Sequence, residues 1–116
     1  MLTLQTRKVE PDIVVVEVAG RITIGRDCKQ LEWKTAELVK EQARKVIFDL
    51  DQVTHVDSTG IGVIMFCAGQ LKQAGGELRV ASAKGHVQEV FKITNVDAIV
   101  AMDPTAAVAV EKFGSA

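Results

Sequence analysis

The chain has 116 residues, 47% of them hydrophobic and 25% charged, so it can bury a core as one domain without disulfides or a metal. Its 14 basic and 15 acidic residues are spread along the sequence and give a net charge of −1. This balance argues against direct binding of nucleic acid and against a basic patch that attaches to membranes. No signal peptide is recognisable, and no apolar run is long enough to span a bilayer. We therefore expect a single cytoplasmic domain over residues 1–116.

The few residues that often bind metals or form disulfides have no matching spacing. Cys28 and Cys67 do not suggest a disulfide framework, and Cys67 lies in an apolar helical pattern, which favours a reduced core thiol. His55 and His86 lack partners at the spacing of metal ligands, and His86 is expected in solvent near a helix start. We expect neither a metal nor a cofactor.

The first elements are two strands. Residues 2–7 and Ile13–Ala19 are strand-like, and Glu10-Pro11-Asp12 between them has turn chemistry. The second segment is almost continuously β-branched, which favours a strand buried on at least one face. Gly20 is expected to end it, leaving residues 21–25 short and irregular.

A helix is expected from Asp27, which can serve as its cap. Six residues, most of them apolar, fall on one side at helical spacing, namely Cys28, Leu31, Thr35, Leu38, Val39 and Gln42. Trp33, the only tryptophan, falls roughly opposite this stripe. Its ring either lies flat over neighbouring side chains or contacts a partner protein, since tryptophan is enriched at binding hot spots.

The second half alternates strands and helices. Val46–Leu50 is a central strand, and a helix follows from about Thr59 to Ala74 with a core stripe of Ile61, Ile64, Met65, Ala68 and Leu71. Gly75-Gly76 provides a left-handed helix stop. The remaining expected elements are a strand at 77–81, a helix marked by Val87, Val90 and Phe91, a strand at 98–101 and a terminal helix with Asp103 at its cap and Pro104 at its first position.

This order predicts an α/β fold. Strands joined by helical crossovers pair in parallel, whereas the first two strands can form an antiparallel unit at one edge. We therefore expect a mixed sheet covered by about four helices.

Residues 54–62 join the central strand to the next helix, at the strand end where open α/β folds place functional groups. Either Asp57 or Ser58 can cap this helix. Gly60 and Gly62 each cost the helix roughly 1 kcal/mol relative to alanine, so they must serve close approach. The approaching group is either the sheet or the backbone of a partner, and the sequence does not distinguish the two.

Three catalytic motifs are similar to this segment but do not match it. An extra residue separates Asp57 from Thr59-Gly60, which is the wrong spacing for an aspartic protease. Val56 stands where the hydrolase nucleophile elbow needs glycine. Met65 stands where a dinucleotide fingerprint needs its third glycine. We therefore expect a protein that is not an enzyme.

The run from Val46 to Gly62, with Asp57-Ser58-Thr59-Gly60 near its end, resembles the signature of the STAS domain and in particular that of bacterial anti-anti-sigma factors. The segments 75–78 and 87–95 are similar to the helix exit, the next strand and the third helix of that family. The resemblance covers nearly the whole chain.

The resemblance implies an anti-sigma factor antagonist that regulates transcription by partner switching. In such proteins the unphosphorylated form binds an anti-sigma factor that is also a serine kinase. The kinase phosphorylates the serine after the aspartate, here Ser58, and a serine phosphatase reverses this. The expected partner-binding residues are Gly20, Arg21, Ile22, Thr23, Asp57, Thr59, Gly60 and Gly62. Thr23 stands where many members have aspartate. A scaffold or ligand-sensing module in a signalling assembly is the alternative function.

A phosphate on Ser58 adds about −1.5 to −2 charge at a helix N-terminus, where negative charge is favourable. We therefore predict that it blocks a partner without unfolding the domain. Asp57, with Asp49 and Asp51, is expected to add like-charge repulsion. An exposed Phe66 together with Val63 would extend the binding surface along the helix.

Overall fold

Five strands form one sheet in the order in which they follow each other along the chain. The computed structural model describes residues 2–114, apart from the side chains of Arg26 and Asp27. The elements are β1 (Leu2–Val9), β2 (Ile13–Ile22), α1 (Arg26–Lys40), β3 (Lys45–Val56), α2 (Ser58–Gln73), β4 (Glu77–Ala81), α3 (Gly85–Ile93), a 3-10 helix (Val96–Ala98), β5 (Ala101–Asp103) and α4 (Ala106–Gly114). Strand β1 pairs with β2 antiparallel, and all the other pairings are parallel. The predicted mixed α/β sheet is confirmed.

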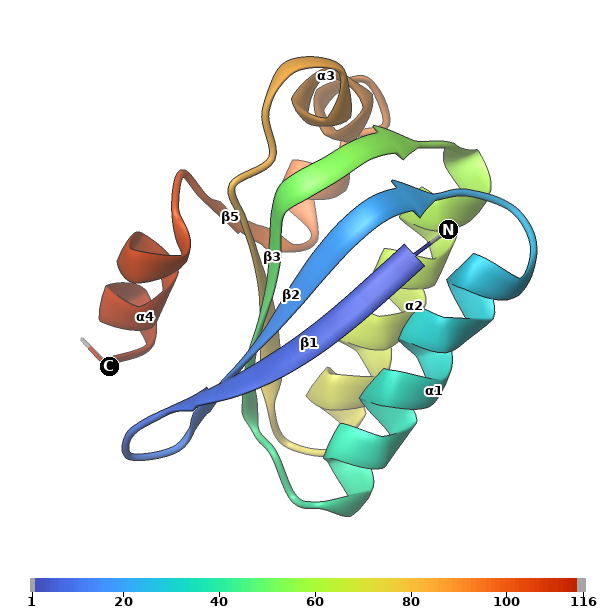
Figure 1. Ribbon diagram of the computed structural model, residues 1–116. Coiled ribbons are helices and arrows are strands. Elements are labelled where there is room, and N and C mark those ends of the chain that lie inside the picture. The colour runs from blue at the N-terminus through green and yellow to red at the C-terminus, as the bar shows by residue number, and fades with distance from the viewer. Residues whose placement is uncertain (1, 115–116) are drawn as a thin grey trace.

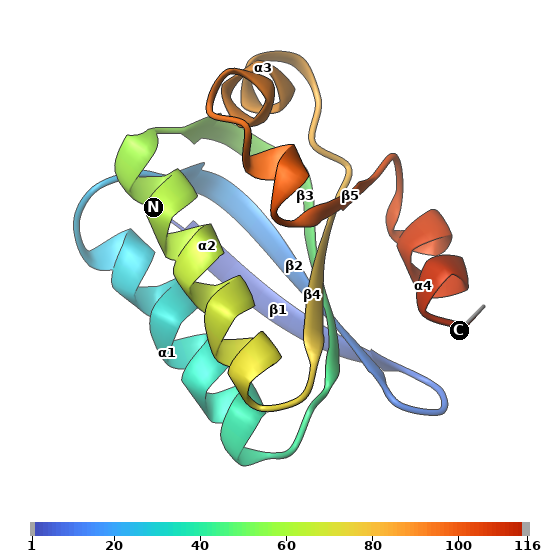
Figure 2. The same cartoon turned by 180° about the vertical axis from the view of Figure 1, so that it is seen from behind.

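The helices lie on both sides of the sheet. Helices α1 and α2 lie side by side over one face, while α4 covers part of the other face and α3 lies at one end of the sheet (Figures 1 and 2). The larger core fills the α1 and α2 side, with Phe48, Leu31 and Leu71 among its fully buried side chains. A smaller core under α4 consists of Ile13, Val15, Ile47, Ala81, Ala106, Ala109 and Phe113. Within residues 2–114, none of the helices has the length and apolar character needed to cross a bilayer.

Strands β2 and β3 are longer than the sequence predicted. Gly20 does not end β2, because it adopts a φ of 109° next to register shifts in the β2–β3 pairing, and the strand continues to Ile22. Only glycine adopts such a φ without strain, so it permits an irregularity within the strand in place of a break. Strand β3 likewise runs to Val56, which places residues 54–56 in the sheet and not in a connection. The extended ends pair with each other, Ile22 opposite Val56.

The helix ends differ in how well the sequence predicted them. The stop at Gly75-Gly76 is confirmed: Gly75 has a φ of 87°, and the Gly76 N–H donates to the Leu71 carbonyl at 2.7 Å. Helix α1 begins at Arg26 after Gly25, which offers no side-chain cap. The predicted cap Asp27 thus lies within the helix, and its side chain is outside the described residues.

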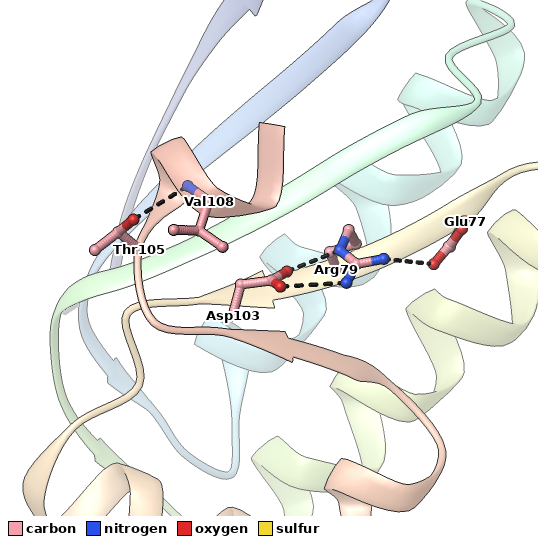
Figure 3. A network of polar contacts seen from close by, with 5 residues as sticks. All are labelled: Glu77, Arg79, Asp103, Thr105 and Val108. Atoms are coloured by element: carbon pink, nitrogen blue, oxygen red, sulfur yellow. Dashed lines mark hydrogen bonds and ion pairs between the residues drawn. The ribbon is translucent and has the colours of Figure 1, made fainter. Parts of the chain in front are cut away.

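The C-terminal elements differ most from expectation. Residues 96–98 form a 3-10 helix, and the last strand is Ala101–Asp103. Asp103 does not cap α4, because its buried carboxylate binds the Arg79 guanidinium through two hydrogen bonds of 2.7 and 3.2 Å (Figure 3). The Thr105 Oγ1 accepts from the Val108 N–H at 3.1 Å and caps the helix instead. The ion pair therefore links β4 to β5.

Candidate functional site

The start of α2 carries the candidate phosphoacceptor. Strand β3 ends at Val56, and Ser58 is the first residue of the helix, with an exposed side chain. Asp57 is the N-cap residue, since its Oδ1 accepts a hydrogen bond from the Gly60 N–H at 2.8 Å. Of the two possible caps, the structure therefore has Asp57. Among residues 2–114, the Ser58 hydroxyl has no hydrogen-bond partner.

The second oxygen of Asp57 joins two parts of the site. Its Oδ2 accepts a hydrogen bond from the Ile24 N–H at 3.0 Å, and the Asp57 N–H donates to the Ile22 carbonyl at 3.3 Å. The connection from β2 to α1 is thereby held against the tip of α2. The two segments expected to bind a partner, residues 20–23 and 57–62, thus lie next to each other.

The two glycines of this helix tip have different environments. A Cβ added to Gly60 would overlap the carbonyl oxygen of Ile22 and lie 3.0 Å from the Ile22 Cγ2. A Cβ added to Gly62 would meet nothing within 4 Å, and Gly62 is exposed. Gly60 therefore allows the helix to approach the end of β2. Gly62 is not needed for packing within the chain, so its surface is open to a partner.

Only some residues of the segment before α1 are accessible to a partner. Arg21 is exposed, whereas the Ile22 side chain is fully buried and supports the site from the core. Thr23 is partly buried, and its carbonyl accepts a hydrogen bond from the Cys28 thiol at 2.9 Å. The Gly20 carbonyl accepts one from the Thr54 hydroxyl at 3.3 Å. Ile24, which no sequence pattern indicated as a site residue, has 76% of its surface exposed next to Asp57.

The start of α3 lies beside the end of β3. The rings of His55 and His86, both exposed, have centroids 5.8 Å apart. Lys84 binds Asp51 at 2.9 Å, and this hydrogen bond holds the pKa of the Asp51 carboxyl below its usual value. Within the described part of the chain, no group of three His, Cys, Asp or Glu residues is arranged to hold a metal ion.

Asp49 and Asp51 of β3 do not face the start of α2, contrary to the expectation from the sequence. Asp49 and Asp51 line a groove of about 440 Å³ on the sheet, together with residues of β1 and β2 that include Thr3, Gln5 and Glu17. Asp51 also has its charge compensated by Lys84. Of the three aspartates expected to repel a phosphate on Ser58, only Asp57 is part of the tip.

Other residues on the exposed side of α2 follow Ser58 along the helix. Phe66 is 53% exposed, as anticipated, but Val63 is only 8% exposed and belongs to the core, so it does not extend a binding surface. Gly62 and Gly69, whose missing side chains leave open space, lie one turn to each side of Phe66. The phenyl ring is thus accessible along the helix.

The remaining candidate residues belong elsewhere. Trp33 on α1 has 64% of its surface exposed and lines a groove beside β1 together with Leu4 and Lys34. Cys28 and Cys67 are both buried, and within the described residues neither forms a disulfide. Burial raises the pKa of the Cys67 thiol to about 11, which keeps it protonated and unreactive at neutral pH.

Similar proteins have been described as regulators of sigma factors. BtrV of Bordetella bronchiseptica, described as a candidate anti-sigma factor antagonist, is 38% identical over 68 residues. This alignment covers 59% of the present chain and 59% of BtrV, so the chain matches less than two thirds of that relative. A candidate anti-sigma factor antagonist from Thermotoga maritima has a crystal structure that superposes with a TM-score of 0.85 at 25% identity, covering 94% of this chain and 92% of the other.

The fold extends to more distant relatives. SpoIIAA of Bacillus in its phosphorylated form superposes with a TM-score of 0.72 at 19% identity, covering 96% of this chain and 99% of SpoIIAA. At that identity the likeness concerns the fold alone. The sequence model of the STAS domain matches residues 5–109, from β1 into α4. With most of its length matched and its sheet shared with these structures, the chain belongs to the STAS domain family.

Proposed function

We propose that this protein is an anti-sigma factor antagonist that acts through partner switching in the cytoplasm. While Ser58 is unphosphorylated, the α2 tip binds an anti-sigma factor that is also a serine kinase, and the sigma factor is set free. The kinase transfers phosphate from ATP to Ser58, the partner leaves, and a serine phosphatase restores binding. The observation that carries this proposal is an exposed, unpaired serine hydroxyl beside a capping aspartate.

Ser58 suits modification by another enzyme better than catalysis of its own. A nucleophilic serine needs a general base within hydrogen-bond reach. Among residues 2–114, the hydroxyl contacts no histidine or carboxylate, and each Asp57 oxygen already accepts a backbone N–H. We therefore propose a binding protein with no reaction of its own.

Phosphorylation would change the surface and leave the fold intact. A phosphate on the first residue of α2 lies at the positive end of the helix dipole, where an exposed negative charge is favourable by roughly 0.3–1 kcal/mol. The cap made by Asp57 does not use the Ser58 hydroxyl, so it survives the modification. The added bulk and charge, next to the Asp57 carboxylate, would occlude a partner at the tip.

The surface proposed to bind the partner combines polar and apolar groups. Thr59 and Gly62 follow Ser58 on the exposed side of α2, and Ile24 lies beside them through its hydrogen bond to Asp57. Arg21 is the exposed charge of the neighbouring strand end. Because Thr23 replaces the aspartate of many relatives, we expect a partner that does not offer a cation at this position.

The central test compares Ser58→Ala, Ser58→Glu and Thr59→Ala. Each variant is incubated with anti-sigma kinases of the same organism, with and without ATP and Mg²⁺. Intact mass and peptide mapping over residues 54–72 then locate any phosphate. We expect one phosphate on wild type and on Thr59→Ala, none on Ser58→Ala, and loss of kinase binding in Ser58→Glu with unchanged thermal unfolding. Phosphate on another residue, or an unfolded Ser58→Glu, would contradict the proposal. Partner-independent binding of a small molecule would favour a ligand-sensing module instead.

The open helix surface provides a separate test of where the partner binds. If the backbone of the partner approaches at Gly62, a methyl group there weakens binding while the isolated domain remains folded. Gly69→Ala is the matched control, because Gly69 is equally open but lies two turns further from Ser58. Equal affinity of Gly62→Ala and wild type for the kinase would remove Gly62 from the contact surface.

A further inference from the structure

Strand β1 is an edge of the sheet, and part of that edge is unprotected. It pairs with β2 through eight residue pairs without a register shift, and no described residue pairs with its other side. Proteins commonly protect such edges with lysines, prolines or bulges. Here the charged residues Arg7 and Lys8 lie near the hairpin turn, and residues 2–6 carry no charge and no proline. The first half of β1 is therefore free to pair with another strand.

A partly apolar groove lies directly beside this edge. It measures about 290 Å³ between β1 and α1 and is lined by Leu2, Leu4, Gln30, Trp33, Lys34 and Glu37. The indole ring of Trp33 is mostly exposed here, at 64%. Lys34 and Glu37 form an ion pair of 2.7 Å, so the rim of the groove carries no net charge. A strand added to β1 would place every second side chain over this groove.

We propose that β1 pairs with β1 of a second copy of this chain. The two strands run antiparallel about a two-fold axis at Leu4, and the two five-stranded sheets become one continuous sheet. In this register Thr3 faces Gln5 of the other copy, and Leu4 faces Leu4. Leu2 and Leu4 point to the helix side of β1, as their packing against the main core requires. Each copy therefore places its Leu4 next to the Trp33 of the other.

The charges favour the second copy as the occupant. The net charge of −1 gives little repulsion between two copies. No charged side chain of the described strand opposes another within the paired segment, because Arg7 and Lys8 lie beyond it. Leu4 lines the groove, is only partly buried and meets Leu4 of the other copy across the axis, so this part of the surface is complementary to itself. Such pairing goes beyond the proposed partner switch and uses no residue of α2.

A matched pair of variants tests the register. Thr3 and Gln5 are exposed on the face away from α1, and Gln5 lies opposite Glu17 within the chain. Thr3→Lys/Gln5→Lys would place lysine against lysine twice across the two-fold axis. Thr3→Glu/Gln5→Lys would place glutamate against lysine twice, with the same lysine next to Glu17. Sedimentation equilibrium of both variants and wild type measures the dimer dissociation constant.

We expect wild type to dimerise with a dissociation constant below about 1 mM. The lysine–lysine variant should dimerise about tenfold more weakly than the glutamate–lysine variant. The fluorescence of Trp33, the only tryptophan, should shift to shorter wavelength with rising concentration of wild type and of the glutamate–lysine variant. Trp33→Ala should weaken the dimer at least tenfold and leave circular dichroism unchanged, because its ring is mostly solvent-exposed.

Three results would each contradict the proposal. A wild-type chain that is monomeric up to about 1 mM excludes the second copy and leaves the edge to a strand of another protein. Equal dissociation constants for the two charged variants exclude this strand pairing even if a dimer exists, because the register demands opposite effects. A Trp33→Ala variant that dimerises as wild type does would likewise exclude the groove from the interface.

Discussion

Gly60 and Gly62, two residues apart at the start of α2, should respond to alanine in opposite ways. The methyl group of Gly60→Ala would collide with the carbonyl oxygen of Ile22, a backbone atom at the end of a paired strand. That atom cannot rotate away, so α2 must move from β2. The methyl group of Gly62→Ala enters open space and only improves helix propensity.

The size of each effect follows from these contacts. Overpacking against fixed atoms costs typically about 1–3 kcal/mol. Displacing the helix tip also weakens the hydrogen bonds that Asp57 makes to Ile24 and Ile22, each worth about 1 kcal/mol. We therefore expect Gly60→Ala to lower the free energy of unfolding by about 2–4 kcal/mol. Gly62→Ala should raise it by about 0.5–1 kcal/mol.

Urea unfolding followed by far-ultraviolet circular dichroism measures both changes. Trp33 fluorescence is a poorer probe of unfolding because the ring is already exposed in the folded chain. Gly69→Ala, in the same helix with equally open surroundings, should stabilise the domain as Gly62→Ala does. A Gly60→Ala variant as stable as wild type would refute the close approach of α2 to Ile22, and a destabilised Gly69→Ala variant would refute the reasoning from open space.

Two further predictions concern the polar contacts that hold the fold. Asp57→Ala should lower the free energy of unfolding by about 1–3 kcal/mol, since it removes both the cap on Gly60 and the hydrogen bond from Ile24. Asp57→Asn can keep one oxygen for the cap and should lower it less, as thermal or urea unfolding would show. Asp103→Ala should lower the free energy of unfolding by about 3–5 kcal/mol, because it leaves the largely buried Arg79 guanidinium without its main partner. Arg79→Met/Asp103→Leu should recover part of that loss in the same assay, and no recovery would mean that the buried charge is not the cause.

Sequence patterns predicted the order of the elements because the burial of one face of a helix or strand determines the spacing of its apolar residues. The β-branched residues of β2 pack into the cores on both faces of the sheet, and the helical stripe of α1 packs into the main core. The helix stop at Gly75 is a local signal that needs no distant partner. STAS membership was also expected from the resemblance of residues 46–62 to the family signature, and the family model matches residues 5–109. Local signals were thus sufficient for the fold class and for the family.

The wrong predictions involve interactions between residues far apart in the chain. Asp103 before Pro104 has the local pattern of a helix cap, but Arg79 from β4 binds its carboxylate more strongly. Gly20 has the pattern of a strand end, but pairing with β3 continues the strand past it. The hydrogen bond from Ile24 to Asp57 spans 33 positions, and no spacing rule could have indicated it. A residue with several possible local roles is assigned only when its distant neighbours are known.

The division of roles between Asp57 and Ser58 bears directly on the proposed switch. If the Ser58 hydroxyl capped α2, phosphorylation would alter the cap, and signalling would perturb the fold by about 0.5–2 kcal/mol. Asp57 caps the helix instead, and its other oxygen holds Ile24 and hence the neighbouring connection. In the proposed switch, Ser58 would therefore gain and lose a phosphate without any change to the cap of the helix. A switch of this kind can be reversed many times, because neither state requires the domain to refold.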